Sequence, residues 1–277
     1  MTEHFQLIYP VSDRLKEHIY CYYTINSTSD DFVSRHYSFP HTYNAVTIYN
    51  GATFNCTDAH LKVEGDGHSP GFCLLQGKRQ APLMVELGGI FSRITILFKP
   101  LGLNHFIIGC LGNLLGPAPS LFNEWEIPAK LFQVDQQRQI LLLEDLLCRH
   151  YRPFVQPALK QALHLLDDFE CEHTVEEIAL AAGLPLRTFN RLFKAHLGVS
   201  PVVHRRIARF RHSLENKVFH DRFKKLIEIG YASNCYDQSD FIKLYHQMAG
   251  ANPRALFGKL APLADSRLVF EFINQAG

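Results

Sequence analysis

Residues 174–254 contain two segments that match each other when one is shifted along the chain. Phe189 corresponds to Phe241 at an offset of 52 positions, and Gly198 corresponds to Gly250 at the same offset. The segments read EEIALAAGLPLRTFNRLFKAHLGVSP and IEIGYASNCYDQSDFIKLYHQMAGANP. Each predicts a short apolar helix, a tight turn and a second helix with a polar outer face. The sequence therefore predicts two helix-turn-helix units in one chain.

Local signals set the ends of these helices. Thr174 is a predicted N-cap, and Glu177 follows as its capping-box partner. Gly183 falls where the first turn needs a left-handed residue, and Asn234 occupies the matching place in the second segment. Asp237 is a predicted N-cap. The inward positions are expected to form the core: Ile178, Leu184, Phe189, Leu192 and Phe193, then Leu226, Ile229, Phe241, Leu244 and Tyr245.

The charge of the chain is unevenly distributed. The whole sequence carries a net charge of only +1. From Pro185 to Leu260, however, fourteen Lys and Arg residues stand against five Asp and Glu residues, and the rest of the chain is acidic. Because the basic region coincides with the repeated segments, we interpret it as an electrostatic footprint for a phosphate backbone.

The second helix of each segment carries polar side chains on its outer face. Arginine and lysine can bind O6 and N7 of guanine, and asparagine and glutamine can bind N6 and N7 of adenine. A solvated helix face is the alternative interpretation. The candidate base-reading residues are Arg187, Asn190 and Arg191 in the first segment and Gln238, Ser239 and Lys243 in the second.

Other polar side chains are expected to contact the DNA backbone rather than the bases. A long basic helix predicted from Val202 to Lys217 connects the two segments and spans roughly 24 Å at about 1.5 Å per residue. For its arginines, phosphate contact and intramolecular pairing both remain open. The candidate phosphate-contacting residues are Thr188, Lys194, Arg205, Arg206 and Arg209.

The first part of the chain has the pattern of a β-rich domain. Short β-branched and aromatic runs alternate with turn-forming clusters, which favours a barrel or a sandwich, a cupin-like barrel among them. A short helix is predicted from Arg14 to His18. The expected strands are Ile19 to Ile25, Ala45 to Tyr49, Gly71 to Leu75 and Ile94 to Phe98.

The periodicity changes to that of a helix near the middle of the chain. Residues Gln133 to Tyr151 predict an amphipathic helix with a wide apolar face. Leu141, Leu142, Leu146 and Leu147 widen this face, so the helix is expected either to pair with its copy in a homodimer or to pack on a domain core. A further helix is predicted from Ala158 to Phe169.

The predicted fold class is α+β, with a β-rich domain, linker helices and an all-α domain that holds both helix-turn-helix units. The expected regions are a sensing or regulatory domain at 1–115, a linker with the amphipathic helix at 116–156, a DNA-binding domain at 157–260 and a tail at 261–277.

Several functional classes lack support in the sequence. No apolar run is long enough to span a bilayer, and the N-terminus lacks a signal-peptide h-region, which favours a cytoplasmic protein. The seven cysteines are scattered without a C-x-x-C motif, as expected of free thiols. The histidines show no metal-ligand spacing, and no nucleophile with a matching base is evident, so we expect no metal, no cofactor and no catalysis.

Residues from about Pro157 to Leu260 strongly resemble the DNA-binding domain of the AraC/XylS family of bacterial transcription regulators. The best-matching pieces are LPLRTFNRLFKAHLGVSP and YDQSDFIKLYHQMAGANP. The resemblance implies that two recognition helices, joined by one long helix, enter successive major grooves of DNA. It places Arg187, Asn190 and Arg191 at the first reading position, and Gln238, Ser239 and Lys243 at the second.

The chain departs from the family pattern at several positions. Pro185 stands in place of the usual N-cap serine, which removes a hydroxyl but is compatible with a helix start. Tyr245 replaces the usual phenylalanine, and His246 replaces the usual lysine. Phe98 to Gly102 is like a segment in one group of the family's sensing domains.

The sequence thus predicts a cytoplasmic, nucleoid-associated transcription regulator that binds promoter or operator DNA. Its expected partners are double-stranded DNA, RNA polymerase, a second copy of the chain and a small-molecule effector that the sequence does not identify. One alternative is a constitutive DNA-binding protein whose first domain is only a dimerisation platform. Another is an enzyme whose last domain targets it to DNA.

Overall fold

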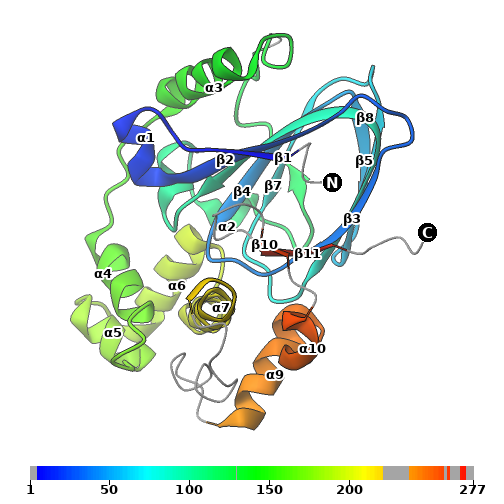
Figure 1. Cartoon of the computed structure of the whole chain (residues 1–277). Coiled ribbons are helices and arrows are strands. Elements are labelled where there is room, and N and C mark those ends of the chain that lie inside the picture. Colours follow the sequence, from blue (N-terminus) through cyan, green and yellow to red (C-terminus); the bar gives the residue numbers. More distant parts are fainter. Residues whose placement is uncertain (1–4, 129, 221–236, 259–260, 263–268, 273–277) are drawn as a thin grey trace. The chain divides into compact units, whose positions relative to one another are not determined.

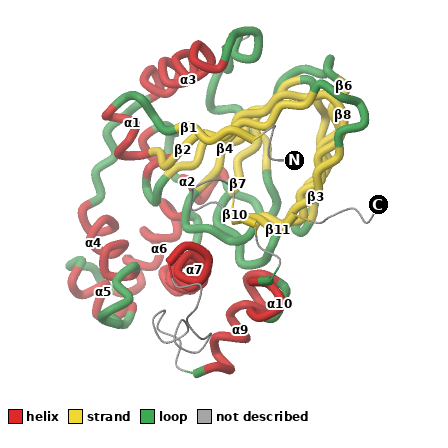
Figure 2. Tube along the Cα trace, viewed as in Figure 1, coloured by secondary structure: helices red, strands yellow, loops and turns green. Residues whose placement is uncertain are grey.

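The computed structural model describes residues 5–128, 130–220, 237–258, 261–262 and 269–272 (Figures 1 and 2). The chain divides into two compact units. Unit 1 comprises Met1–Ser34, Tyr43–Gly77 and Glu86–Val155. Unit 2 comprises Arg35–Thr42, Lys78–Val85 and Gln156–Gly277. Each unit is therefore built from three separate stretches of the chain.

Unit 1 is organised around the long strand β8 (Leu83–Phe98), which enters this unit at Glu86. This strand pairs antiparallel with β2 (Ile19–Ser27) on one side and with β4 (Asn44–Asn50) on the other. The remaining pairs of the unit are β1 (Phe5–Ile8) with β2, β4 with β7 (Phe72–Gln76), β7 with β9 (Ser120–Leu121), β5 (Ala52–Cys56) with β6 (His60–Asp66), and β6 with β8.

The four predicted strands are confirmed as parts of β2, β4, β7 and β8. The short helix α1 (Asp13–His18) is confirmed as well. Two short helical turns follow the sheet, η2 (Gly102–His105) and α2 (Leu111–Leu114). Strands β1, β5, β6, β9 and β3 (Val33–Ser38) were not predicted from the sequence, and only the last part of β8 was.

The predicted amphipathic helix is α3 (Gln136–His150), whose N-cap Asp135 accepts a hydrogen bond from the main chain of Arg138. Its buried apolar side chains, Ile140, Leu143, Leu146 and Leu147, belong to the same core cluster as the β8 residues Ile94, Ile96 and Phe98. Packing on a domain core therefore accounts for the width of the apolar face. Among the leucines of α3, only Leu141 is largely exposed, at 46%.

A buried carboxylate fixes α3 in place. Glu144 accepts hydrogen bonds from the main-chain nitrogens of Val11 and Ser12 at 2.7 and 3.0 Å, and from the hydroxyl of Tyr22 at 3.3 Å. A buried charge is stable only when hydrogen bonds replace water around it. These contacts join α3 to the loop before α1 and to strand β2, so residues 136–150 are an integral part of unit 1.

Unit 2 is mainly helical. It contains α4 (Pro157–Leu166), α5 (Val175–Ala181), α6 (Leu186–Leu197), α7 (Pro201–Glu215), which continues into the π-helical turn η3 (Asn216–His220), α9 (Gln238–Ala249) and α10 (Pro253–Phe257). The long connecting helix is confirmed as α7. With the sheet of unit 1, these helices confirm the α+β class.

Two features of unit 2 go beyond the expected all-α domain. The last described residues form strands β10 (Ala261–Pro262) and β11 (Val269–Phe272), and β11 pairs antiparallel with His36 to Ser38 of β3. In addition, Phe39 joins a core cluster with Phe210 of α7 and Tyr245 of α9. Residues near position 40 therefore complete the core of the helical unit.

Candidate nucleic-acid interface

The first helix-turn-helix unit is α5, a turn and α6. Thr174 and Glu177 form the predicted capping box, with bonds of 2.7 Å from the nitrogen of Thr174 to Oε2 of Glu177 and 3.1 Å from the nitrogen of Glu177 to Oγ1 of Thr174. The bond from the main chain of Thr174 holds the pKa of Glu177 below its usual value. Gly183 has the predicted left-handed conformation, with φ of 68°.

The two faces of α6 differ in the way the sequence predicts. Phe189 and Phe193 are fully buried, and both are core positions. Arg187, Arg191 and Lys194 are exposed. They stand four and three residues apart, so they lie on one side of the helix. A phosphate or a base edge that approaches this side would meet three cations in succession.

Asn190 and Thr188 are less available than the cations of α6. Both are half-buried, and Nδ2 of Asn190 donates a 3.0 Å hydrogen bond to the main-chain oxygen of Leu186. Base reading by Asn190 thus requires its amide oxygen and its second N–H. The helix begins at Pro185 without a side-chain cap, as expected, and it ends at Gly198 with φ of 78°.

The second candidate reading helix is α9. Its N-cap Asp237 accepts a 2.8 Å hydrogen bond from the nitrogen of Asp240, which confirms the predicted capping role. Gln238, Ser239 and Lys243 are exposed, whereas the predicted core residues Phe241, Leu244 and Tyr245 are buried. Leu226, Ile229 and Asn234, which were assigned to the first helix and turn of this unit, lie outside the described residues.

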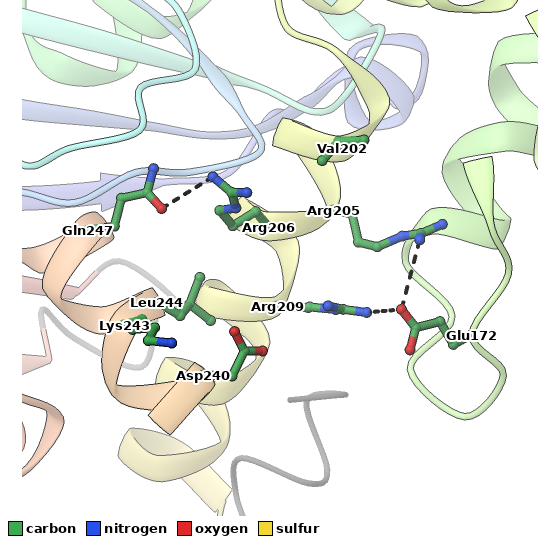
Figure 3. Close-up of a pocket in the computed structure, with 9 residues that line it drawn as sticks. All are labelled: Glu172, Val202, Arg205, Arg206, Arg209, Asp240, Lys243, Leu244 and Gln247. Atoms are coloured by element: carbon green, nitrogen blue, oxygen red, sulfur yellow. Dashed lines mark hydrogen bonds and ion pairs between the residues drawn. The ribbon is translucent and has the colours of Figure 1, made fainter. Parts of the chain in front are cut away.

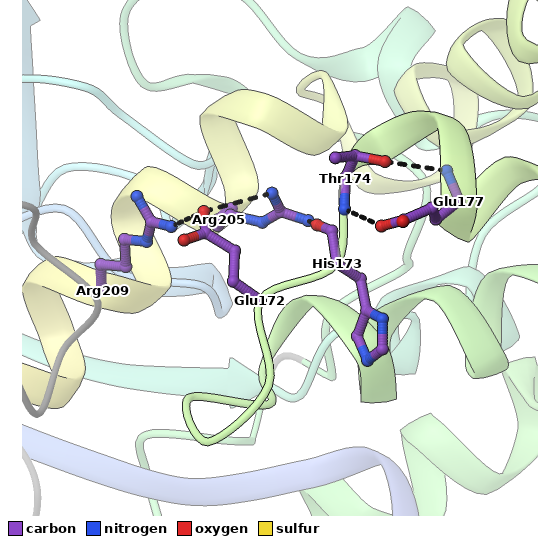
Figure 4. Close-up of polar contacts among 6 residues, drawn as sticks. All are labelled: Glu172, His173, Thr174, Glu177, Arg205 and Arg209. Carbon is purple, nitrogen blue, oxygen red and sulfur yellow. Dashed lines mark hydrogen bonds and ion pairs between the residues drawn. The ribbon is translucent and has the colours of Figure 1, made fainter.

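The predicted phosphate-contacting arginines of α7 have intramolecular partners. Arg209 donates from Nη2 to Oε1 of Glu172, and Nη1 of Arg205 lies 4.0 Å from the same oxygen (Figure 4). Arg205 also donates to the main-chain oxygen of His173. Intramolecular pairing, one of the two roles left open, is therefore present for both residues. Arg206 is held by Gln247 of α9, with 3.2 Å between Nη1 and Oε1.

These arginines line a pocket of about 440 Å³ between α7, α9 and Glu172 (Figure 3). Its other lining residues are Val202, Asp240, Lys243, Leu244 and Gln247. The candidates Lys243, Arg205, Arg206 and Arg209 are thus brought together at one site. The residues of α6 are not part of it. Sequence reasoning missed Glu172, because no periodicity links the loop after α4 to a face of α7.

Among the residues that the structure describes, no cluster of three or more histidine, cysteine, aspartate or glutamate side chains could hold a metal ion. No described helix is long and apolar enough to cross a membrane. The basic surfaces of α6, α7 and α9 form the candidate site in the described part of the chain.

No protein-family model and no curated protein matches the sequence. Solved structures of ToxT from Vibrio cholerae are similar to the chain at low identity. The 1.65 Å structure has 10% identity over 86% of this chain and 98% of that chain, with a TM-score of 0.46. ToxT bound to an unsaturated fatty acid has 15% identity over 84% and 96% of the two chains, with a TM-score of 0.40. ToxT from strain O395, bound to (E)-4-(8-methylnaphthalen-1-yl)but-3-enoic acid, has 11% identity over 92% and 98%, with a TM-score of 0.43.

Proposed function

We propose that this chain is a sequence-specific, DNA-binding transcription regulator of the AraC/XylS type, without a catalytic role. One observation carries the proposal: α6 has a fully buried apolar face and an opposite exposed face that presents Arg187, Arg191 and Lys194. A helix that is anchored on one side and cationic on the other suits the major groove of DNA. The matched helix α9 presents Gln238, Ser239 and Lys243.

Binding proceeds in two steps in this proposal. The basic surface of unit 2 first associates with the phosphate backbone, so that affinity falls steeply with salt. Side chains of α6 and α9 then select bases in successive major grooves, about 34 Å apart along the duplex. In α6, the side chains of Arg187, Asn190 and Arg191 read bases, and those of Thr188 and Lys194 contact phosphates.

Unit 1 senses a small molecule, joins two copies of the chain, or does both. The regulator works in the cytoplasm on nucleoid DNA, where RNA polymerase is its further partner. A thermal-shift screen of the full chain against a broad metabolite set separates a sensor from a platform. Stabilisation by a metabolite identifies a sensor, and no stabilisation by any compound favours a platform that only dimerises.

The test of DNA binding is fluorescence anisotropy of the full chain with duplex DNA from upstream of its own gene, against random duplex, at two salt concentrations. Arg191→Ala and Lys243→Ala are each expected to weaken specific binding by about 1–3 kcal/mol and to relax preference at one base position. The matched control is Lys160→Ala, which removes an exposed lysine from α4, outside both reading helices. Equal loss on specific and random DNA would instead identify phosphate contacts, and a wild-type chain that binds no DNA contradicts the proposed function.

A further inference from the structure

The pocket between α7 and α9 has the charge of an anion site. Three guanidinium groups and one ammonium group line it, against the carboxylates of Glu172 and Asp240 (Figure 3). Arg205 and Arg209 are only 15% and 16% exposed, so they are fixed by the surrounding structure rather than free in solvent. Pre-positioned guanidinium groups favour planar or tetrahedral oxyanions, because they donate two hydrogen bonds in a fixed geometry.

The pocket is continuous with the proposed reading surface. Lys243, a candidate base-reading residue of α9, forms one wall of it, and Arg206 of α7 bonds to Gln247 one turn further along α9. A duplex held by α9 therefore brings its backbone towards this pocket. The oxyanion that we expect in a pocket beside a DNA-reading surface is a phosphodiester of the DNA backbone.

In the structure, the carboxylate of Glu172 pairs with the guanidinium groups of Arg205 and Arg209. Its Oε1 atom receives the hydrogen bond from Arg209 and lies 4.0 Å from Nη1 of Arg205 (Figure 4). A glutamate carboxylate and a phosphodiester each carry one negative charge and offer two oxygens to an arginine. Glu172 thus presents the arginines with the same charge and the same number of acceptor oxygens as the expected ligand.

The ion pair that Glu172 makes is exchangeable. Its side chain is 37% exposed, and pairs with this much contact with solvent contribute only about 0–1 kcal/mol. Glu172 lies in the loop between α4 and α5, two residues before the N-cap Thr174. The carboxylate can therefore leave the arginines without disruption of either helix.

We infer that the pocket is a phosphodiester site of the DNA interface and that Glu172 fills it in the DNA-free chain. On binding, a backbone phosphate replaces the carboxylate of Glu172 on Arg205 and Arg209. This inference rests on the proposed function, and it adds a residue that restrains affinity for all DNA without any choice of sequence.

The test is the variant Glu172→Gln in the full chain. It is expected to bind specific and random duplexes about two- to five-fold more tightly at low salt, since the exchanged ion pair is worth at most about 1 kcal/mol. The plot of log K against log salt is expected to steepen, because in the variant a bound phosphate displaces small anions from the arginines, whereas in the wild-type chain it displaces a carboxylate of the protein.

Glu176→Gln is the matched control, because it removes the same charge from an exposed glutamate of α5 that does not line the pocket. Its effect is expected to be smaller than that of Glu172→Gln. In an Arg209→Ala background, Glu172→Gln is expected to lose most of its gain. Far-ultraviolet circular dichroism and thermal unfolding show whether each variant is folded.

Three results overturn the inference while the proposed function stands. They are unchanged binding by Glu172→Gln, a gain equal to that of Glu176→Gln, or weaker binding, which would mean that Glu172 positions Arg209 for DNA. If the wild-type chain shows no salt-dependent DNA binding, the proposed function itself is wrong. The wild-type measurement therefore separates the two failures.

Discussion

The ammonium nitrogen of Lys78 donates a 2.9 Å hydrogen bond to the main-chain oxygen of Leu197, the last residue of α6. The lysine is 8% exposed. Burial lowers the pKa of Lys78 to about 7, and the charge of Asp167 opposes this shift. Asp167 lies 3.4 Å from Nε2 of the fully buried His204, whose pKa burial also lowers. Two separate stretches of unit 2, Lys78–Val85 and Gln156–Gly277, thus meet at the end of α6.

The lysine is expected to make the free energy of unfolding depend on pH. Between pH 7 and about 10.5 the unfolded chain holds the proton of Lys78 and the folded chain does not, so stability rises with pH by up to about 1.4 kcal/mol per unit. Lys78→Met is expected to abolish this rise. Urea unfolding at pH 7 and pH 9 measures the difference, with exposed Lys160→Met as control. Equal pH dependence of Lys78→Met and the wild-type chain would show that the lysine does not lose its proton on folding.

Phe39 is expected to stabilise the helical unit. It is 5% exposed, and its ring lies edge-on to that of Phe210 with 6.3 Å between the centroids. Phe39→Ala leaves a cavity in this core, at an expected cost of about 3–5 kcal/mol. The thermal unfolding of the full chain, followed by circular dichroism at 222 nm, measures the loss. Val33→Ala, at a position 41% exposed at the start of the preceding strand β3, is expected to cost far less, and similar losses for both variants would count against the packing role.

Tyr245 is expected to stabilise the core of unit 2 through its hydroxyl group. Its fully buried hydroxyl lies 2.9 Å from Oγ of Ser213, and Ser213 donates to the oxygen of Phe210 at 2.8 Å. The tyrosine is therefore the donor to the serine. Tyr245→Phe is expected to cost about 1 kcal/mol of stability. A double-mutant cycle with Ser213→Ala is expected to show a coupling energy of similar size, whereas additive losses would mean that the two hydroxyls act independently.

Unit 1 is expected to lose stability in mild acid. The ring of His18 stacks on that of His105 with 3.8 Å between the centroids. Burial first, and the charge of His105 second, lower the pKa of His18 to about 4. As pH falls from 6.5 to about 4, the unfolded chain gains this proton before the folded chain does, so stability decreases. His18→Phe is expected to reduce the drop in melting temperature between pH 7 and pH 5, and exposed His68→Phe is expected to leave it unchanged. The same drop in both variants would assign the acid sensitivity to other groups.

The features that the sequence predicts are those that neighbouring residues determine. Thr174 and Glu177 are three residues apart, so their capping box can be predicted from the local sequence. The faces of α6 and α9 follow from helical periodicity in the same way. Strand β3 escaped prediction because its run, VSRHYS, is polar, although Ser34 and His36 are buried. In β8 the pair Gly88 and Gly89 interrupts the apolar pattern, and Gly89 has φ of 74°.

The features that the sequence does not predict depend on distant residues. Nothing near Lys78 indicates that it bonds to Leu197, and nothing near Glu172 indicates that it meets Arg209. The role of α3 also depends on residues that are distant in the sequence. Its apolar width suits a dimer as well as a core, and only the position of Leu146 and Leu147 in the cluster of unit 1 distinguishes the two.

Unit 2 combines residues that are far apart in the chain, and this affects when it can fold during translation and how its gene can be divided. Phe39 leaves the ribosome about two hundred residues before Met248, yet both belong to one core cluster, so unit 2 completes its folding only when translation is nearly finished. A gene fragment that starts at Pro157 encodes the described helices of unit 2, from α4 to α10, but neither Phe39 nor Lys78. Recombination cannot move such a region between proteins as a simple cassette, because part of its interior is encoded upstream of the junction.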